Sequence, residues 1–132
     1  MTKIEYRLHH ASMLVSNTQE SLKFYVDTLG MEQTNRPKLA FPGAWLKVGD
    51  CQIHLLELPS PDPKTGRPPH GGRDRHVAVT VADITPVKQR LDDADIPYTV
   101  SISGRQALFC RDPDGNAIEI IADVEIANMA NV

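Results

Sequence analysis

The chain has 132 residues, of which 41% are hydrophobic and 23% charged, and its formal net charge is -3 at pH 7. These values exclude a disordered chain, fit one compact domain and leave no basic surface for nucleic acid. No apolar run reaches the ~20 residues that cross a bilayer, and the N-terminal residues lack the apolar core of a signal peptide. We therefore expect a cytoplasmic protein without a membrane partner.

The first half of the chain predicts a strand, a helix and a hairpin. The strand runs from His10 to about residue 15, and residues 17–20 then have the spacing of a helix capping box. Gly30 ends the helix, and residues 44–48 and 51–58 form a hairpin around the turn Gly49-Asp50. The expected buried stripe of the helix consists of Leu22, Tyr25, Val26 and Leu29.

Residues 59–74 contain five prolines and three glycines, so this segment cannot continue a strand or a helix. It is either a plain linker between two structural units or a loop that borders a binding cleft.

The second half repeats the order of the first. A strand begins at His76, Asp83 is in position to cap a helix, and Pro86 falls in its first turn. Residues 106–110 and 117–121 then form a second hairpin. The expected apolar stripe of this helix consists of Ile84, Val87, Leu91 and Ala94.

The two halves can be superimposed as sequences. Residues 10–17 match residues 76–83, and residues 53–56 match residues 118–121. The units therefore span residues 6–58 and 75–123 of a single domain, 1–132, with the loop 59–74 between them. In both, a polar side chain stands at the start of the first strand and in the middle of the last.

Those equivalent positions hold His10 and His76 at the strand starts, and His54 and Glu119 within apolar runs. A single histidine in a strand is usually no more than a hydrogen-bonded side chain, but four such groups at repeat-equivalent places indicate a shared role. A carboxylate in an apolar run needs a partner, and a metal ion would supply one for all four groups. Three imidazoles and a carboxylate suit Fe, Mn, Co, Ni or Zn better than Ca or Mg.

Other candidate groups fit the pattern less well. His9 points away from His10, His70 lies in the proline-rich loop, and Glu57 has the opposite parity to His54 on its strand. Cys51 and Cys110 are expected to be reduced, buried thiols, because the chain has only two cysteines and no secretory signal. Neither belongs to a CxxC motif, which argues against a metal-binding or redox role.

The sequence resembles the glyoxalase/bleomycin resistance/extradiol dioxygenase superfamily, also called the vicinal oxygen chelate fold, from His10 to about Ala122. The residues that carry the resemblance are His10-Ala-Ser-Met-Leu-Val, Ser21-Leu-Lys-Phe-Tyr-Val-Asp-Thr-Leu-Gly30, Gln52-Ile-His-Leu-Leu-Glu57, Arg75-His-Val-Ala-Val-Thr-Val81 and Phe109-Cys-Arg-Asp-Pro-Asp-Gly-Asn-Ala-Ile-Glu119.

The resemblance implies an α+β fold: two βαβββ modules whose mixed sheets curl into a cup, with the helices outside. It also implies a homodimer and one divalent metal ion held by His10, His54, His76 and Glu119. The site lies either within one chain or across two. Glyoxalase I usually has Glu or Gln at the place of His54.

The activity implied first is that of a glyoxalase I-like lyase or isomerase, which stabilises the enediolate of a small oxygenated or thiol-conjugated substrate and uses Glu119 as the base. Five arginines are available for the carboxylates of glutathione. They are Arg36, Arg67, Arg73, Arg105 and Arg111.

The alternatives are an Fe(II)-dependent extradiol-type dioxygenase and a non-catalytic small-molecule-binding or resistance protein.

Overall fold

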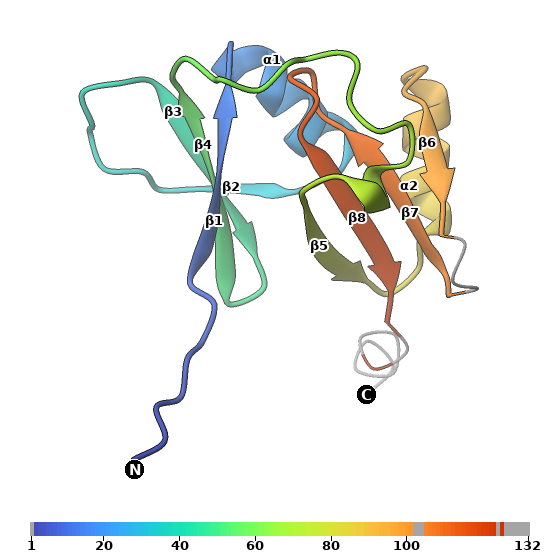
Figure 1. Cartoon of the computed structure of the whole chain (residues 1–132), viewed down its shortest axis with the longest axis horizontal. Helices are drawn as coiled ribbons and strands as arrows, with labels where there is room; N and C mark the ends of the chain where they lie inside the picture. Colours follow the sequence, from blue (N-terminus) through green and yellow to red (C-terminus); the bar gives the residue numbers. More distant parts are fainter. Residues whose placement is uncertain (1, 102–104, 124, 126–132) are drawn as a thin grey trace.

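A computed structural model describes residues 2–101, 105–123 and 125, which form two mixed sheets of four strands each (Figure 1). The strand orders are β1-β4-β3-β2 and β5-β8-β7-β6, so the second sheet repeats the topology of the first. The α+β fold with curled, unclosed sheets is therefore confirmed. The strands are β1 (His10–Val15), β2 (Glu32–Thr34), β3 (Gly43–Val48), β4 (Cys51–Glu57), β5 (His76–Val81), β6 (Tyr98–Val100), β7 (Ala107–Arg111) and β8 (Ala117–Ala122).

In each sheet the first strand pairs in parallel with the last, and the hairpin strands pair antiparallel. Both predicted hairpins are present. The short strands β2 and β6 were not located by the sequence analysis, because three residues are too few to show a period of two.

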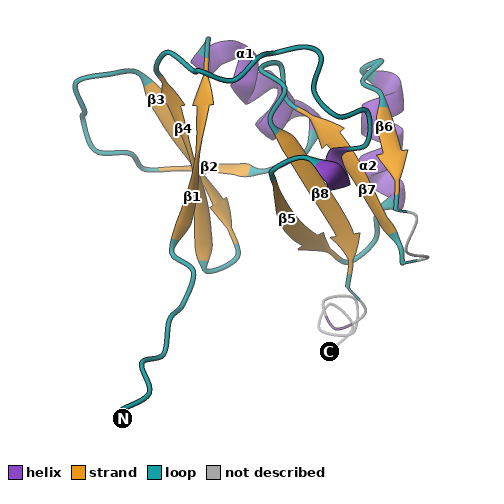
Figure 2. Cartoon of the chain, viewed as in Figure 1, coloured by secondary structure: helices purple, strands orange, loops and turns teal. Residues whose placement is uncertain are grey.

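In Figure 2 the helix of the first module lies near the upper ends of β3 and β4, and the helix of the second module lies beside β6 and β7. In the first module α1 (Thr18–Leu22) begins where Asn17 accepts the backbone N–H of Glu20 at 3.0 Å, as the capping box predicts. The chain then continues as a π-helix over Lys23–Thr28. This wider turn buries Phe24 as well as Tyr25, so the apolar stripe expected for a regular α-helix was incomplete.

In the second module α2 (Thr85–Asp93) begins after Ile84, one residue beyond the predicted cap. Asp83 still serves this helix end, because its carboxylate accepts the backbone N–H of Thr85 at 2.9 Å. Ile84, Val87 and Leu91 are buried as expected, whereas Ala94 is exposed. No helix among the described residues is long and apolar enough to cross a membrane.

One continuous apolar core joins the two modules. The side chains of β1 alternate, so Met13 and Val15 enter the core while His10 and Ser12 face the opposite side. The same alternation in β5 buries Val79. The helix-free face of each sheet, on which the predicted ligands lie, is called the cup face below.

The modules are also joined by a buried polar seam, formed by Asp112 with Tyr25, Asn116 and Leu14. The Tyr25 hydroxyl donates to Asp112 Oδ2 at 2.7 Å, and Asn116 Nδ2 donates both to that oxygen at 2.8 Å and to the Leu14 carbonyl at 3.0 Å. Burial raises the pKa of Asp112, and these hydrogen bonds oppose the rise. Tyr25 is fully buried, and burial with the adjacent carboxylate raises its pKa well above the usual value.

The loop 59–74 crosses from the first sheet to the second and is fastened by Asp74 (Figure 1). Its carboxylate lies 2.8 Å from Arg67 Nε and 2.7 Å from Arg111 Nη1, and the hydrogen bond from Arg111 is the main reason that its pKa falls to about 2. A short 3₁₀-helix, Gly71–Arg73, ends the loop against Phe109.

The N-terminal residues from 2 onward extend away from the body of the molecule (Figure 1), up to Leu8 and His9, whose carbonyls accept hydrogen bonds from Cys51 Sγ and the Gln52 N–H. Ile4, Tyr6 and Leu8 alternate along this arm and are 68%, 86% and 71% exposed. Both cysteines are free thiols, as expected, but only Cys110 is buried and Cys51 is half-buried. Burial raises the pKa of Cys110 to about 12.

The seam predicts that Tyr25→Phe lowers the free energy of unfolding by about 1.5–3 kcal/mol, because a buried carboxylate loses one hydrogen-bond donor. Urea denaturation followed by circular dichroism measures the loss. The matched control is Tyr98→Phe, whose exposed hydroxyl lies 3.5 Å from Asp92 and whose loss should cost less than about 0.5 kcal/mol. Equal losses in the two variants would contradict the role of the seam.

The ion pairs of Asp74 with Arg67 and Arg111 predict that part of the free energy of unfolding depends on pH. Because the folded-state pKa of Asp74 is depressed to about 2, its contribution is present above the ordinary aspartate pKa and disappears as the pH falls toward 2. The difference in unfolding free energy between wild type and Asp74→Asn should therefore be larger at pH 6 than at pH 2.5. Asp62→Asn removes the more exposed pair with Arg75 and should cost little at either pH. If the difference in unfolding free energy between wild type and Asp74→Asn did not change with pH, the ion pairs of Asp74 would not be what stabilises the loop.

Candidate functional site

The first sheet brings two of the predicted ligands together. Ser12 and His54 are register partners in the parallel pair of β1 and β4, so His10 and His54 share the cup face. Their rings stack with centroids 4.0 Å apart and an interplanar angle of 17°. His54 is only 7% exposed, and burial, followed by the nearby His10, lowers its pKa. A neutral imidazole is the form that binds metal ions.

His54 has two further neighbours that the sequence analysis did not name. Trp45 stacks on its other side, with centroids 4.0 Å apart and planes 5° from parallel. Gln52 Oε1 lies 2.8 Å from His54 Nε2. Both neighbours could have been predicted from the sequence. Gln52 is two residues from His54 on the same strand and so faces the same side, and the turn at Gly49-Asp50 places Trp45 opposite His54.

The second sheet brings the other two predicted ligands together. Glu119 is 2% exposed, and its Oε1 lies 3.3 Å from His76 Nε2. The carbonyl oxygen of Asp74 lies 2.9 Å from His76 Nδ1 and can only accept a hydrogen bond, so Nδ1 carries a proton. Arg105, which the sequence did not single out for this role, donates to Glu119 Oε2 at 2.8 Å.

These atoms are suited to a cation. With the proton on Nδ1 of His76, a neutral ring presents the Nε2 lone pair to a carboxylate oxygen, and two such acceptors need a proton or a metal ion between them. The His10–His54 pair adds two imidazole rings to this donor set. Three imidazoles with one carboxylate are a donor set for first-row transition metals and zinc rather than for Ca²⁺ or Mg²⁺.

The two pairs nevertheless remain on separate sheets. Among the described residues, no three His, Cys, Asp or Glu side chains lie close enough to hold one metal ion. A cavity of about 300 Å³ lies between the sheets, lined by Ser12 and Leu14 of β1 and by His76 of β5. The cup faces of both modules therefore border one space, although the four predicted ligands do not converge within one chain.

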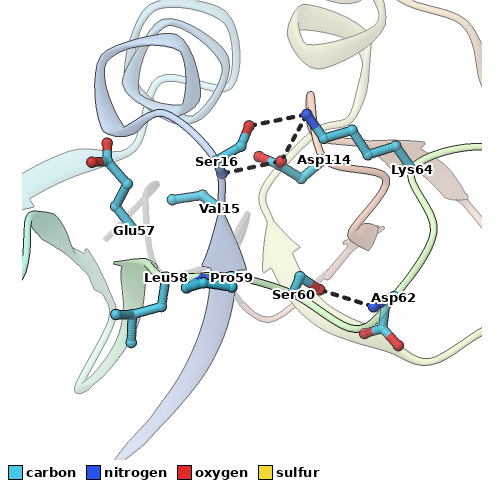
Figure 3. Close-up of a pocket in the computed structure, with 9 residues that line it drawn as sticks. All are labelled: Val15, Ser16, Glu57, Leu58, Pro59, Ser60, Asp62, Lys64 and Asp114. Carbon is cyan, nitrogen blue, oxygen red and sulfur yellow. Dashed lines mark hydrogen bonds and ion pairs between the residues drawn. The ribbon is translucent and has the colours of Figure 1, made fainter.

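A second cavity, of about 380 Å³, lies at the other end of β1 (Figure 3). Its charged groups have protein partners: Glu57 accepts the Thr18 N–H at 2.8 Å, and Asp114 accepts the Ser16 N–H at 3.1 Å and lies 3.6 Å from Lys64. It contains none of the four predicted ligands, and residues of both modules line it, Glu57 from the first and Asp114 from the second.

The remaining candidates have other contacts. The prediction that His9 points away from His10 was wrong: their Nδ1 atoms lie 2.8 Å apart, because His9 precedes β1 and strand alternation does not apply to it. His70 caps the 3₁₀-helix and contacts Phe109. Four of the five arginines expected to be available for a substrate have protein partners. Arg67 and Arg111 hold the loop, Arg36 donates to the Phe41 carbonyl, and Arg105 donates to Glu119. Glu57, as its strand parity indicated, does not join His54.

Comparison with known proteins gives a consistent family. The profile of the Glyoxalase/Bleomycin resistance protein/Dioxygenase superfamily matches residues 7–120. "Glyoxylase I 4" of Arabidopsis thaliana is 35% identical over 119 residues, 86% of this chain and 68% of its own length. The glutathione transferase FosA of Serratia marcescens is 30% identical over 116 residues, 86% of this chain and 78% of its own.

Solved structures agree on the architecture. A glyoxalase family protein from Bacillus anthracis superposes with a TM-score of 0.74 at 25% identity, over 91% of this chain and 97% of that one. An antibiotic-binding protein, TnmS3, from a Streptomyces species gives a TM-score of 0.67 at 20% identity, over 91% and 98% of the two chains. The second of these shows likeness of fold alone. From the matched profile, the relatives and the repeated βαβββ architecture, this chain belongs to the glyoxalase/bleomycin resistance protein/dioxygenase superfamily.

Proposed function

We propose that the protein is a metal-dependent lyase or isomerase of the glyoxalase I type, acting on a small oxygenated or thiol-conjugated substrate. The observation that carries the proposal is the pairing of the buried Glu119 with His76 on one cup face, matched by His10 with His54 on the other. The relative named "Glyoxylase I 4" supports the same reaction class.

In this proposal His10, His54, His76 and Glu119 hold one divalent ion, either Zn, Ni, Co, Mn or Fe. When bound, the ion would stabilise negative charge on the oxygen atoms of the substrate. Glu119 is the only carboxylate of the set and is therefore the base that accepts a proton from the substrate. Arg105 donates a hydrogen bond to Glu119 Oε2, and the other carboxylate oxygen, Oε1, is the one nearer to His76.

We further propose that the site is completed by a homodimer, with His10 and His54 from one chain and His76 and Glu119 from its partner. Two observations support a second copy. The pairs do not converge within the described part of one chain, and the arm exposes Ile4, Tyr6 and Leu8 on alternate positions, a pattern typical of a half-buried strand. A twofold dimer would hold two equivalent sites.

A second reaction is worth testing, because FosA of Serratia marcescens is a glutathione transferase and is 30% identical. By the family resemblance, His10, His76 and Glu119 would also supply the two histidines and one glutamate of a fosfomycin-modifying enzyme. The metal-loaded protein should be assayed with the methylglyoxal–glutathione hemithioacetal, with fosfomycin plus glutathione, and, with Fe(II), for oxygen uptake on a catechol. Turnover of the hemithioacetal alone supports the first proposal, and adduct formation alone replaces it with the second.

The ligand set predicts that Glu119→Gln weakens metal retention, because the ion loses its only anionic ligand while the side-chain volume is kept. Elemental analysis after purification without chelator or affinity nickel measures the loss. Remetallation at saturating ion should restore occupancy but not turnover, since an amide does not accept the proton at neutral pH. Full activity after remetallation would leave Glu119 as a ligand only. Glu57→Gln, on the opposite face of β4, is the matched control and should keep its metal.

The shared site predicts that two defective variants complement each other. His54→Ala removes a ligand from the His10–His54 pair, and Glu119→Gln removes one from the His76–Glu119 pair. In a mixed dimer one site combines the two unchanged pairs, and the other site combines the two changed pairs. After unfolding and refolding an equimolar mixture, random pairing should restore about a quarter of the wild-type metal-dependent activity. The separately refolded variants are the controls. A mixture no more active than those controls would place the site within one chain.

A further inference from the structure

We propose that Trp45 and Gln52 are positioning residues, which hold the His54 ring in one orientation and one tautomer so that Nδ1 is its metal-binding atom. This inference rests on the proposed metal site and concerns how one of its ligands is prepared. Neither residue is among the four predicted ligands.

The orientation of the ring follows from a three-ring stack. His54 lies between Trp45 and His10, with centroid distances of 4.0 Å on both sides and interplanar angles of 5° and 17°. A histidine ring normally turns through a broad range of χ2 angles. Turning a ring that lies between two nearly parallel rings would drive its edge into both neighbours. The stack therefore restricts His54 before any ion arrives. The lone pairs of two parallel rings do not converge, so His10 has to turn out of the stack to bind the same ion, and Trp45 is the neighbour that keeps His54 in place.

The tautomer follows from Gln52. Its Oε1 lies 2.8 Å from His54 Nε2, and an amide oxygen can only accept a hydrogen bond. The proton of the neutral ring is therefore on Nε2, and the lone pair is on Nδ1. Metal-binding histidines commonly donate their second ring N–H in this way, which fixes the tautomer and raises the basicity of the ligand nitrogen.

His76, the histidine of the second sheet, also has one ring nitrogen hydrogen-bonded to an acceptor, but here that nitrogen is Nδ1 and not Nε2. The Asp74 carbonyl accepts from His76 Nδ1 at 2.9 Å, which leaves the lone pair on Nε2 facing Glu119. The two histidines would therefore use different ring nitrogens. Each tautomer is therefore set by its own acceptor, the Gln52 amide at His54 and the Asp74 carbonyl at His76, and not by a polarity common to both sites.

The tautomer can be tested without any metal. Nitrogen-15 NMR of the metal-free protein, labelled at histidine, distinguishes a protonated from an unprotonated ring nitrogen, with His54→Asn used to assign the signals. In the wild type, the His54 Nε2 should be protonated and the Nδ1 unprotonated. Gln52→Leu should give a mixture of the two tautomers. Gln33→Leu, the same replacement on β2, should leave the His54 signals unchanged.

The effect on binding can be tested by calorimetric titration with Ni²⁺. Gln52→Leu should weaken the affinity by roughly 10- to 100-fold, as loss of a partner of a metal-bound histidine commonly does. Trp45→Leu should weaken it as well, while Trp45→Phe, which keeps a flat ring against His54, should remain closer to wild type. Gln33→Leu should bind as wild type does. Circular dichroism spectra of all variants verify that the sheets are intact.

Trp45 also supplies a direct signal, because it is the only tryptophan in the chain. Since its indole stacks on His54, binding of the open-shell ion Ni²⁺ at this histidine should quench the emission of wild type and of Gln33→Leu. The same titration of His54→Ala should give little quenching at equal Ni²⁺ concentration.

The two proposals fail in different ways. If the wild type binds no divalent ion, the proposed metal function is wrong, although the NMR measurement still decides whether Gln52 sets the tautomer. If the wild type binds Ni²⁺ but Gln52→Leu and Trp45→Leu bind equally well, the positioning role is wrong and the metal site remains. A His54 proton found on Nδ1 in the wild type would also overturn the inference.

Discussion

The burial of one carboxylate, Asp112, is the constraint on which the arrangement of the two modules depends. A buried charge is tolerated only where hydrogen bonds replace the water it has lost. Asp112 accepts hydrogen bonds from Tyr25, from the Asn116 amide and from the backbone N–H groups of Asp114 and Asn116. Tyr25 belongs to the first module and the other donors to the second, so satisfying this charge sets the two sheets relative to each other.

That arrangement in turn determines what the cup faces can do. The Asn116 amide reaches the Leu14 carbonyl of β1 as well as Asp112, and Asp114 accepts the N–H of Ser16 just beyond β1. The seam therefore holds the strand that starts at His10 beside the second module. Relatives with this fold carry names as different as a glyoxalase, a transferase and an antibiotic-binding protein. The fold alone does not select among these activities, and the choice depends on the side chains in the cup.

Much of the fold could be predicted from the sequence because it occurs twice. The repeat located both hairpins and both helices, and it made His10 equivalent to His76 and His54 equivalent to Glu119. The structure instead brings together the two candidate ligands of each module, His10 with His54 and His76 with Glu119. Strand alternation could not predict how far apart the two pairs lie, since that distance depends on packing between modules. The contact of Arg105 with Glu119 could not be predicted either, because Arg105 lies outside the helices and strands.

The π-helix shows how local geometry can conceal a pattern that is otherwise regular. Leu29 donates its backbone N–H to the Phe24 carbonyl, five residues earlier, instead of the four that an α-helix uses. The turn thus accommodates one more residue than an α-helical turn, and two successive aromatic side chains reach the same core. In an alignment with a relative whose helix is regular here, the register of residues 23–28 would have to absorb a one-residue insertion. Matching the residues on either side without a gap would assign Phe24 or Tyr25 to the wrong structural position.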